Sequence, residues 1–182
     1  FAPALCNRID RNTGGMVLAA KNAQALRDMN RIIKNNELKK QYLCIVTGVL
    51  PQKEGELRGY LFKDSKENRV YIRPQRQPGS KTVITRYRVL KEKGKELSLV
   101  EVDLITGRTH QIRAHFASIG HPLLGDGKYG SNRINKQYGM FQQALYSYKL
   151  RFALKEKGTC VDDLDGKCFQ VKEVPFVRMF DK

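Results

Sequence analysis

The sequence predicts an α+β fold built around a mixed, largely antiparallel sheet. Several segments have the alternation or the β-rich composition of strands, and two segments with helical character lie between them. The chain has 182 residues, of which 41% are hydrophobic, and this is enough for one domain with an ordinary core. No repeat or low-complexity tract divides the chain, so we expect a single domain over residues 1–182.

The N-terminal part is predicted to form a short strand followed by a helix. "MVLAA" (16–20) has the composition of a short buried strand. Leu26, Met29 and Ile33 recur at spacings of three and four, which is typical of a helix with one buried face. Asn22 stands where the N-cap of this helix would lie.

The middle of the chain is predicted to be β-structure. "QYLCIVTG" (41–48) is rich in strand formers and ends in a glycine. Residues 51–81 are polar and rich in Gly and Pro, which favours a hairpin followed by a loop over 73–81. "TVITRYRVL" (82–90) alternates arginine with apolar residues, and "LSLVEVDL" (97–104) is its predicted partner.

A second helix is predicted in "RTHQIRAHFASIG" (108–120). Thr109 is the candidate N-cap, Gly120 is the predicted stop, and Pro122 prevents continuation. The remaining segments are predicted to be a Gly-rich loop (122–130), a strand (142–152), a turn (162–166) and a final strand (168–176).

The charge of the chain favours a polyanionic partner. Lys and Arg number 34 against 18 Asp and Glu, giving a net charge of +16. Such an excess points first to nucleic acid, with an anionic membrane surface or a cationic secreted protein as the alternatives. The basic residues are spread along the chain rather than gathered on one amphipathic helix, which favours a broad RNA or DNA surface. No apolar run approaches the ~18 residues of a membrane span.

The cysteines do not predict a metal site or a disulfide framework. No two of the four have C-x-x-C spacing, and the chain has only three histidines. A chain with this much core does not need disulfides, so we interpret the cysteines as reduced and expect a cytoplasmic protein. The four are Cys6, Cys44, Cys160 and Cys168.

Asp10 is the first candidate for chemistry. In "NRIDRNTGG" (7–15) it lies between Arg8 and Arg11 and directly before a Thr-Gly-Gly turn. Neighbouring arginines favour the ionised carboxylate, which can act as a nucleophile or a base. Taken alone, the pattern equally describes a structural aspartate in a turn, and that reading is the more common one.

Two further stretches hold candidate residues. "GRTHQIRAH" (107–115) places arginines, histidines and a glutamine on one short helix, a set suited to phosphate and base contacts or simply to a solvated face. Tyr42 lies in a predicted strand, where tyrosine is most often a packing residue, but its ring can stack on a base and its hydroxyl can move a proton.

These stretches, taken in order, resemble the RluA-type pseudouridine synthases. The family signature H-R-L-D-R-x-T-S-G is similar to "NRIDRNTGG", and the Y-x-x-x-V-x-G strand is similar to "YLCIVTG" (42–48). A K-x-x-x-T-x-Y-x-V-L strand matches "KTVITRYRVL" (81–90). The long block G-R-T-H-Q-I-R-x-H-x-x-x-x-G-H-P-L-x-G-D-x-x-Y-G matches "GRTHQIRAHFASIGHPLLGDGKYG" (107–130) almost throughout.

The resemblance implies both a fold and a reaction. It implies the pseudouridine synthase catalytic fold, with a bent sheet flanked by helices and loops. In the reaction, the N1–C1′ bond of an RNA uridine is cleaved, and the uracil turns and is rejoined through C5. This is an isomerisation that needs no cofactor and no metal. The implied partner is ribosomal RNA or tRNA, without a membrane, and we expect a monomer.

The resemblance also implies roles for individual residues. The family's catalytic aspartate corresponds to Asp10, its tyrosine to Tyr42, and the basic partner of the aspartate to Arg113. Arg8 corresponds to the arginine that fills the gap left by a flipped nucleotide. The implied RNA contacts are Arg8, Arg11, Arg108, His110, Gln111 and Lys81.

The departures from the family pattern form a short set. Asn7 replaces the usual His, Gly14 replaces the usual Ser, and Tyr146 stands where His is frequent. The family's K-P-x-G segment is absent, so we expect the natural protein to continue before Phe1. An RNA-binding module without catalysis is therefore the alternative hypothesis from a different class.

Overall fold

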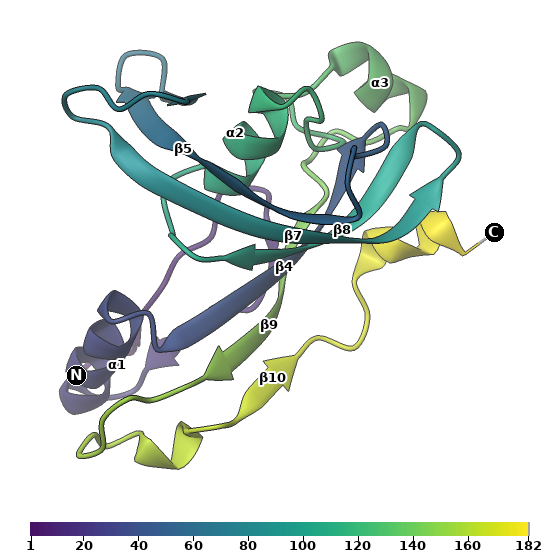
Figure 1. The fold of residues 1–182 in the computed structure, drawn as a ribbon. Coiled ribbons are helices and arrows are strands. Elements are labelled where there is room, and N and C mark those ends of the chain that lie inside the picture. The colour runs from purple at the N-terminus through teal and green to yellow at the C-terminus, as the bar shows by residue number, and fades with distance from the viewer. Residues whose placement is uncertain (182) are drawn as a thin grey trace.

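The computed structural model describes residues 1–181 and consists of one large sheet with helices on its edges and faces (Figure 1). The sheet has eight strands, in the order β10-β9-β4-β8-β7-β5-β6, with β2 pairing beside β9. Every pairing is antiparallel except that of β2 with β9. The strands are β2 (Gly14–Gly15), β4 (Leu38–Thr47), β5 (Glu54–Asp64), β6 (Arg69–Arg73), β7 (Lys81–Lys93), β8 (Leu97–Leu104), β9 (Leu145–Phe152) and β10 (Cys168–Gln170).

The smaller elements complete the α+β architecture that the sequence predicts. A separate two-stranded ribbon forms from β1 and β3. None of the helices described is long and apolar enough to cross a membrane. These elements are β1 (Ala4–Leu5), β3 (Ala19–Ala20), α1 (Ala23–Lys34), α2 (Gln111–Ser118), α3 (Asn132–Gln137) and the 3₁₀ turns Asp162–Leu164 and Pro175–Phe180.

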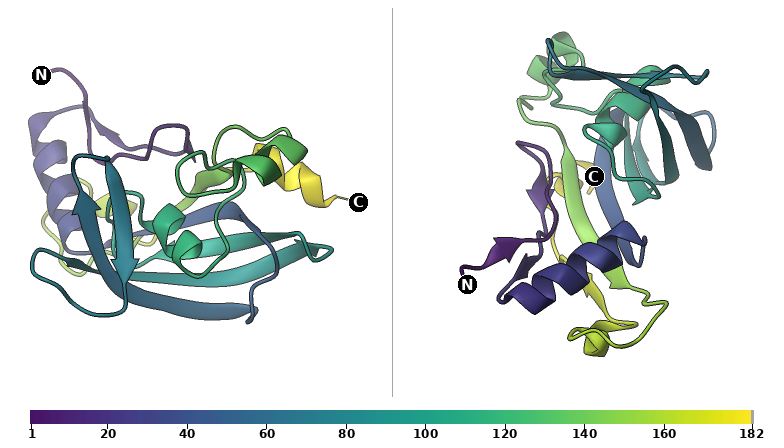
Figure 2. Two further views of the ribbon diagram at one scale, coloured as in Figure 1. Left: turned by 90° about the horizontal axis from the view of Figure 1, so that it is seen from above. Right: turned by 90° about the vertical axis from the view of Figure 1, so that its left-hand side faces the viewer.

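Helix α1 forms as predicted and closes one end of the sheet. The Asn22 side chain accepts a hydrogen bond from the Ala25 amide at 2.8 Å, which caps the helix. Met29 and Ile32 face inward against Leu38 of β4 and Phe152 of β9. Figure 2 shows α1 beside the N-terminal segment, well apart from α2.

The centre of the sheet is buried on both faces. Cys44, Val46 and Val100 pack against Phe116 of α2 on one face. Ile45 lies on the other face, in a cluster with Phe180 near the C-terminus. Successive side chains of a strand point to opposite faces, so a strand covered on both sides is apolar throughout. These central strands therefore form the rigid support of the pocket described below.

Several local predictions are confirmed and others are wrong. The predicted alternation of 82–90 is confirmed: Val83 and Tyr87 are buried, and Arg86 and Arg88 are exposed. The predicted strand 16–20 is wrong except for its last two residues: Met16 and Leu18 make only single backbone hydrogen bonds, to Ser147 and Cys6, and their side chains pack with the α1 cluster. The final strand ends at Gln170 rather than at 176, and Pro175 begins a 3₁₀ turn.

Two errors concern the segment around α2. Thr109 is not the N-cap; the cap position is His110, in the left-handed region with φ of 53° and without a side-chain cap. Gly120 follows the helix with φ of +82°, as a stop residue should. The sequence did not indicate α3, a six-residue helix capped by Ser131, because it is too short to show apolar periodicity.

Candidate active site

A polar pocket of about 170 Å³ lies between the N-terminal loop, β4 and the start of α2. Its walls combine one carboxylate, three cations and several apolar side chains. These residues come from distant parts of the sequence, and they meet because the fold brings the N-terminal loop, β4 and the start of α2 together. The lining residues are Arg8, Ile9, Asp10, Thr13, Lys40, Tyr42, Leu104, Gly107, Arg108, Thr109, Gln111, Ile112 and Leu145.

The loop that carries Asp10 is held on its C-terminal side by glycines. Gly14 and Gly15 form β2, which pairs with Tyr146 and Ser147 of β9. A Cβ on Gly15 would lie 2.2 Å from the Ser147 carbonyl oxygen, and Gly15 has φ of +112°. Only glycine combines that close approach with a positive φ.

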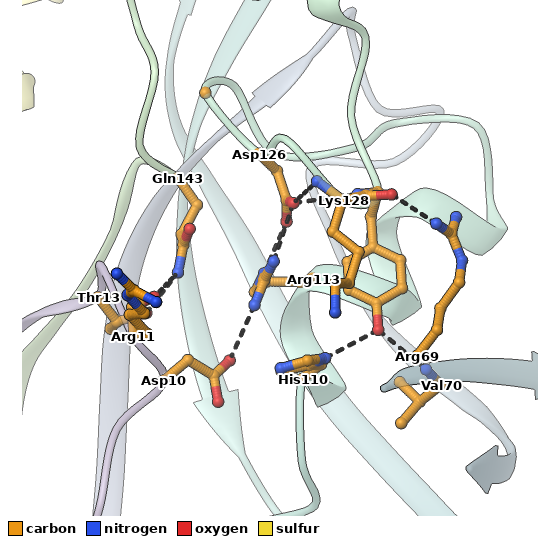
Figure 3. A network of polar contacts seen from close by, with 12 residues as sticks. Asp10, Arg11, Thr13, Arg69, Val70, His110, Arg113, Asp126, Lys128 and Gln143 are labelled. Atoms are coloured by element: carbon orange, nitrogen blue, oxygen red, sulfur yellow. Dashed lines mark hydrogen bonds and ion pairs between the residues drawn. The ribbon is translucent and has the colours of Figure 1, made fainter. Parts of the chain in front are cut away.

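A glutamine also fixes this part of the loop. Gln143 Nε2 donates hydrogen bonds to the Arg11 carbonyl at 2.6 Å and to Thr13 Oγ1 at 3.2 Å (Figure 3). The Thr13 amide in turn donates to the Asp10 carbonyl at 3.0 Å. Both backbone and side chains thus fix the position of Asp10.

Asp10, which lines the pocket, forms an ion pair with Arg113, which lies behind the pocket wall. Arg113 Nη1 lies 3.7 Å from Asp10 Oδ2, and the two side chains are 8% and 23% exposed. Arg113 belongs to the first turn of α2, which the central strands support. The pairing of these two residues, which the resemblance implied, is present in the structure, although the distance is that of an ion pair without a short hydrogen bond.

Asp126 is the stronger partner of Arg113, and sequence reasoning missed it. Arg113 Nε and Nη2 donate to its two oxygens at 2.7 and 3.0 Å. Burial alone would raise the Asp126 pKa, but the hydrogen bonds and charge of Arg113 outweigh burial and lower the pKa. The backbone amides of Lys128 and Tyr129 also donate to Asp126 Oδ1. A bidentate pair of this kind fixes the plane of the guanidinium.

Helix α3 supports this second carboxylate. The buried side chain of Asn135 accepts from the Gly125 amide at 2.7 Å and donates to the Asp126 carbonyl at 3.2 Å. The signals in the sequence were an acid within a Gly-rich loop, which is also typical of an exposed turn, and its place in the family block of 107–130, which carried no role for it. Helix α3 therefore positions Asp126, Asp126 positions Arg113, and Arg113 faces Asp10.

Tyr42 forms the floor of the pocket. It lies in β4 directly after a register shift between Gln41 and Tyr42, and it is 6% exposed. Burial raises the pKa of the Tyr42 phenol, and the negative charge of Asp10 raises it further. The phenol is therefore protonated at neutral pH and can donate a hydrogen bond or a proton.

Lys40 is a pocket residue that sequence reasoning also missed. It lines the pocket two residues before Tyr42. Among residues 1–181, no carboxylate lies within ion-pair distance of its ammonium group. Burial lowers the Lys40 pKa. A Cβ at Gly107 would lie 3.2 Å from Lys40 Nζ, so the glycine leaves room for the ammonium group.

Comparison with known proteins connects this pocket to one family. A sequence model described as RNA pseudouridylate synthase matches residues 1–118. The chain belongs to this family. The matched residues include the Asp10 loop, Tyr42 and the first turns of α2.

Curated relatives of this RNA pseudouridylate synthase family agree with the match. The chain is 39% identical over 134 residues to the RNA pseudouridine synthase YhcT of Bacillus subtilis, covering 72% of this chain and 43% of YhcT. It is 34% identical over 151 residues to the ribosomal large subunit pseudouridine synthase C of Vibrio cholerae, covering 81% and 46%. The chain spans about half the length of the curated relatives it matches.

Solved structures show the same pseudouridine synthase fold. The human RNA Pseudouridylate Synthase Domain Containing 1 protein superimposes with a TM-score of 0.75 at 23% identity, covering 98% of this chain and 79% of that protein. The corresponding human Domain Containing 4 protein gives 0.74 at 21% identity, covering 96% and 72%. The fold predicted from the sequence is therefore confirmed.

The residues that the family resemblance assigned to RNA contact divide into two groups. Arg8, Arg108 and Gln111 line the pocket, whereas Arg11, His110 and Lys81 do not. Gln111 is 2% exposed. Its oxygen accepts from Thr106 Oγ1 and from the Arg108 amide, and its amide group donates to Ile84 and Thr85. Gln111 thus fixes the loop before α2.

His110 points toward Tyr129 rather than into the pocket. Its Nδ1 lies 2.8 Å from the Tyr129 hydroxyl, which accepts a hydrogen bond from the Val70 amide at 2.9 Å. The hydroxyl and Nδ1 share one hydrogen bond, in which either group can be the donor. Burial lowers the His110 pKa, which is consistent with a neutral ring.

Proposed function

We propose that this chain isomerises uridine in RNA to pseudouridine, with Asp10 as the carboxylate that starts the reaction. The observation that supports this most directly is that Asp10 and Tyr42 line one pocket, with Arg113 paired to Asp10 behind it, in a chain of this family. The chain accounts for about half of the length of its curated relatives, so the proposal concerns the activity of this part.

The proposed reaction follows from the residues around the pocket. The Asp10 carboxylate attacks the ribose or the uracil ring, and the N1–C1′ bond breaks. The freed uracil turns and bonds to C1′ through C5, and the bond to Asp10 breaks. The hydrogen on C5 leaves as a proton, and N1 takes up a proton. Tyr42 packs against the uracil and is placed to assist that proton transfer. Arg113, 3.7 Å from Asp10, orients the carboxylate.

The target nucleotide must leave its stack before it reaches the pocket. We propose that the uridine flips out of the RNA and that Arg8, on the pocket rim, fills the vacated space. Flipping costs a few kcal/mol, which stacking on Tyr42 and the inserted guanidinium offset. One relative is named for the large ribosomal subunit, and we propose ribosomal RNA or tRNA as the substrate class, in the cytoplasm, with a monomeric enzyme.

The second candidate is an RNA-binding module without catalysis. The net charge of +16 supports RNA binding under either proposal. RNA labelled with tritium at C5 of uracil distinguishes them, because isomerisation releases that tritium to water. Release by the purified chain without added metal supports the synthase, and binding of the RNA with no release supports the module.

A further inference from the structure

A second groove lies on the opposite face of the sheet, with a volume of about 340 Å³. Five cationic side chains and one carboxylate line it, together with Gln41, Leu104 and Ile105. We call it the basic groove. Its charged residues are Lys39, Lys40, Arg86, Lys149, Arg151 and Asp103.

Strand register explains how these residues gather. Lys39 pairs with Arg151, and Gln41 pairs with both Lys149 and Asp103. Directly paired residues in an antiparallel sheet share a face, so β4, β8 and β9 present one charged row. Successive residues of a strand alternate between faces, and Lys40 accordingly reaches the pocket side.

The charges of this face are neutralised on one half only. On β5 and β7, Glu56 forms ion pairs with Arg58 and with Arg86, and Arg88 pairs with Glu101 of β8. Among residues 1–181, no carboxylate lies within ion-pair distance of the lysines of β4 or of the cations of β9 that line the groove. Asp103, the one acid in the groove, pairs in register with Arg86. The unneutralised half favours an anionic ligand.

The basic groove is adjacent to the active-site pocket. Lys40 and Leu104 line both cavities. Between them runs a rim loop (104–108), with Ile105 on the groove side and Arg108 on the pocket side. Thr106 Oγ1 accepts from the Ile84 amide at 2.9 Å and donates to Gln111 at 2.8 Å, so the rim loop is tethered at its centre.

We infer that the RNA strand flanking the target uridine passes over the rim loop and that its phosphates bind in the basic groove. This inference rests on the proposed function. A flexible polyanion matches two adjacent cavities that share Lys40, because Arg108 adds a cation to the pocket and Lys149 and Arg151 add cations to the groove. Lysine and arginine side chains of this kind fix RNA through its backbone without reading the sequence.

The test uses charge reversal far from the chemistry. Lys149→Glu/Arg151→Glu alters two residues that line only the groove. Binding is measured with single-stranded RNA of roughly 20 nucleotides and of roughly five nucleotides. We expect the variant to bind the long RNA roughly tenfold or more weakly, and the slope of log K against log salt to lose about 1.4 for two phosphate contacts. Binding of the short RNA to the pocket should be unchanged.

A matched control carries the same charge change at the other end of the sheet. Lys95→Glu/Lys136→Glu alters two exposed residues, one in the β7–β8 turn and one in α3. The Tyr138 hydroxyl bonds to Glu96, so α3 ends beside that turn. Thr47 pairs with Leu97, which places the turn at the opposite end of β4 from Lys39. The control should keep the binding and the salt slope of the unaltered chain.

The outcomes separate this inference from the proposed function. The groove variant and the unaltered chain could bind the long RNA with the same affinity and the same salt slope. That result would overturn the proposed role of the groove in RNA binding, whether or not tritium is released. Groove-dependent binding by a chain that releases no tritium would overturn the synthase proposal and keep the groove as an RNA site. If the double reversal does not fold, Lys149→Gln/Arg151→Gln repeats the test with a loss of about 1.4 in slope.

Discussion

Arg113 and Asp126 form a buried bidentate ion pair, with N–O distances of 2.7 and 3.0 Å. Arg113 therefore has its orientation set from the side away from the pocket, and its remaining nitrogen, Nη1, lies 3.7 Å from Asp10. The catalytic carboxylate of the proposed reaction thus depends on a second carboxylate that contributes no pocket surface.

We expect Asp126→Ala to destabilise the fold by about 3–5 kcal/mol, because it leaves the Arg113 guanidinium buried without its partner. Asp126→Asn keeps the shape and should cost less stability, yet still reduce turnover by loosening Arg113. Urea unfolding and tritium-release rates measure the two effects. An Asp126→Ala chain as stable as the unaltered protein would contradict this account.

The pH dependence of the same pair has a defined sign. The Asp126 pKa is lowered in the folded state, so its contribution is complete above the unfolded value of about 3.9 and is lost as the pH falls through the folded value. The stability difference between the unaltered chain and Asp126→Asn should therefore be constant from pH 5 to 7. A difference that grows with pH in that range would argue against an ion-paired Asp126.

His115 should make the protein less stable in mild acid. The ring is 2% exposed, and burial lowers its pKa to about 4. Thr85 Oγ1 accepts from Gln111 and lies 2.8 Å from His115 Nδ1, so the buried ring has a polar partner in its neutral form. The unfolded chain binds a proton near pH 6.5, so stability should fall by about 2 kcal/mol from pH 7 to pH 5. In His115→Gln, the fall in stability between pH 7 and pH 5 should largely disappear. An unchanged fall would show that His115 is not the group responsible.

Gly14 and Tyr146 should be coupled. A Cβ on Gly14 would lie 2.5 Å from Tyr146 Cε2, and the two residues are register partners. Gly14→Ser should destabilise the chain by about 1–3 kcal/mol through overpacking and should slow turnover, since this loop carries Asp10. In Gly14→Ser/Tyr146→His, the smaller ring should restore most of both losses. Additive losses in the double variant would show that the two departures from the family pattern are independent.

Tyr42→Phe separates packing from proton transfer. The variant keeps the ring that would stack on uracil but has no hydroxyl. We expect RNA affinity to be retained and turnover to fall roughly 10²–10⁴-fold, the usual contribution of general acid–base catalysis. Equal losses in affinity and turnover would instead assign Tyr42 a packing role alone.

Much of the fold could be predicted from local periodicity in the sequence. Features that depend on contacts between distant residues could not. The α1 helix was predicted because its apolar spacing and Asn22 cap are both local signals. Asp126 was missed because its burial depends on Asn135 and Arg113, which are separated from it in the sequence. His110 replaced Thr109 at the cap because the Gln111 hydrogen bonds hold the rim loop in place, a tertiary constraint that propensity does not contain.

The most direct test of the central claim is tritium release by Asp10→Asn. The amide keeps the size of the carboxylate and cannot attack the substrate. With RNA labelled at C5 of uracil, release should fall at least about 10³-fold while RNA affinity stays within about twofold of the unaltered chain. Release at the unaltered rate from a chain that lacks the Asp10 carboxylate would contradict the proposed mechanism.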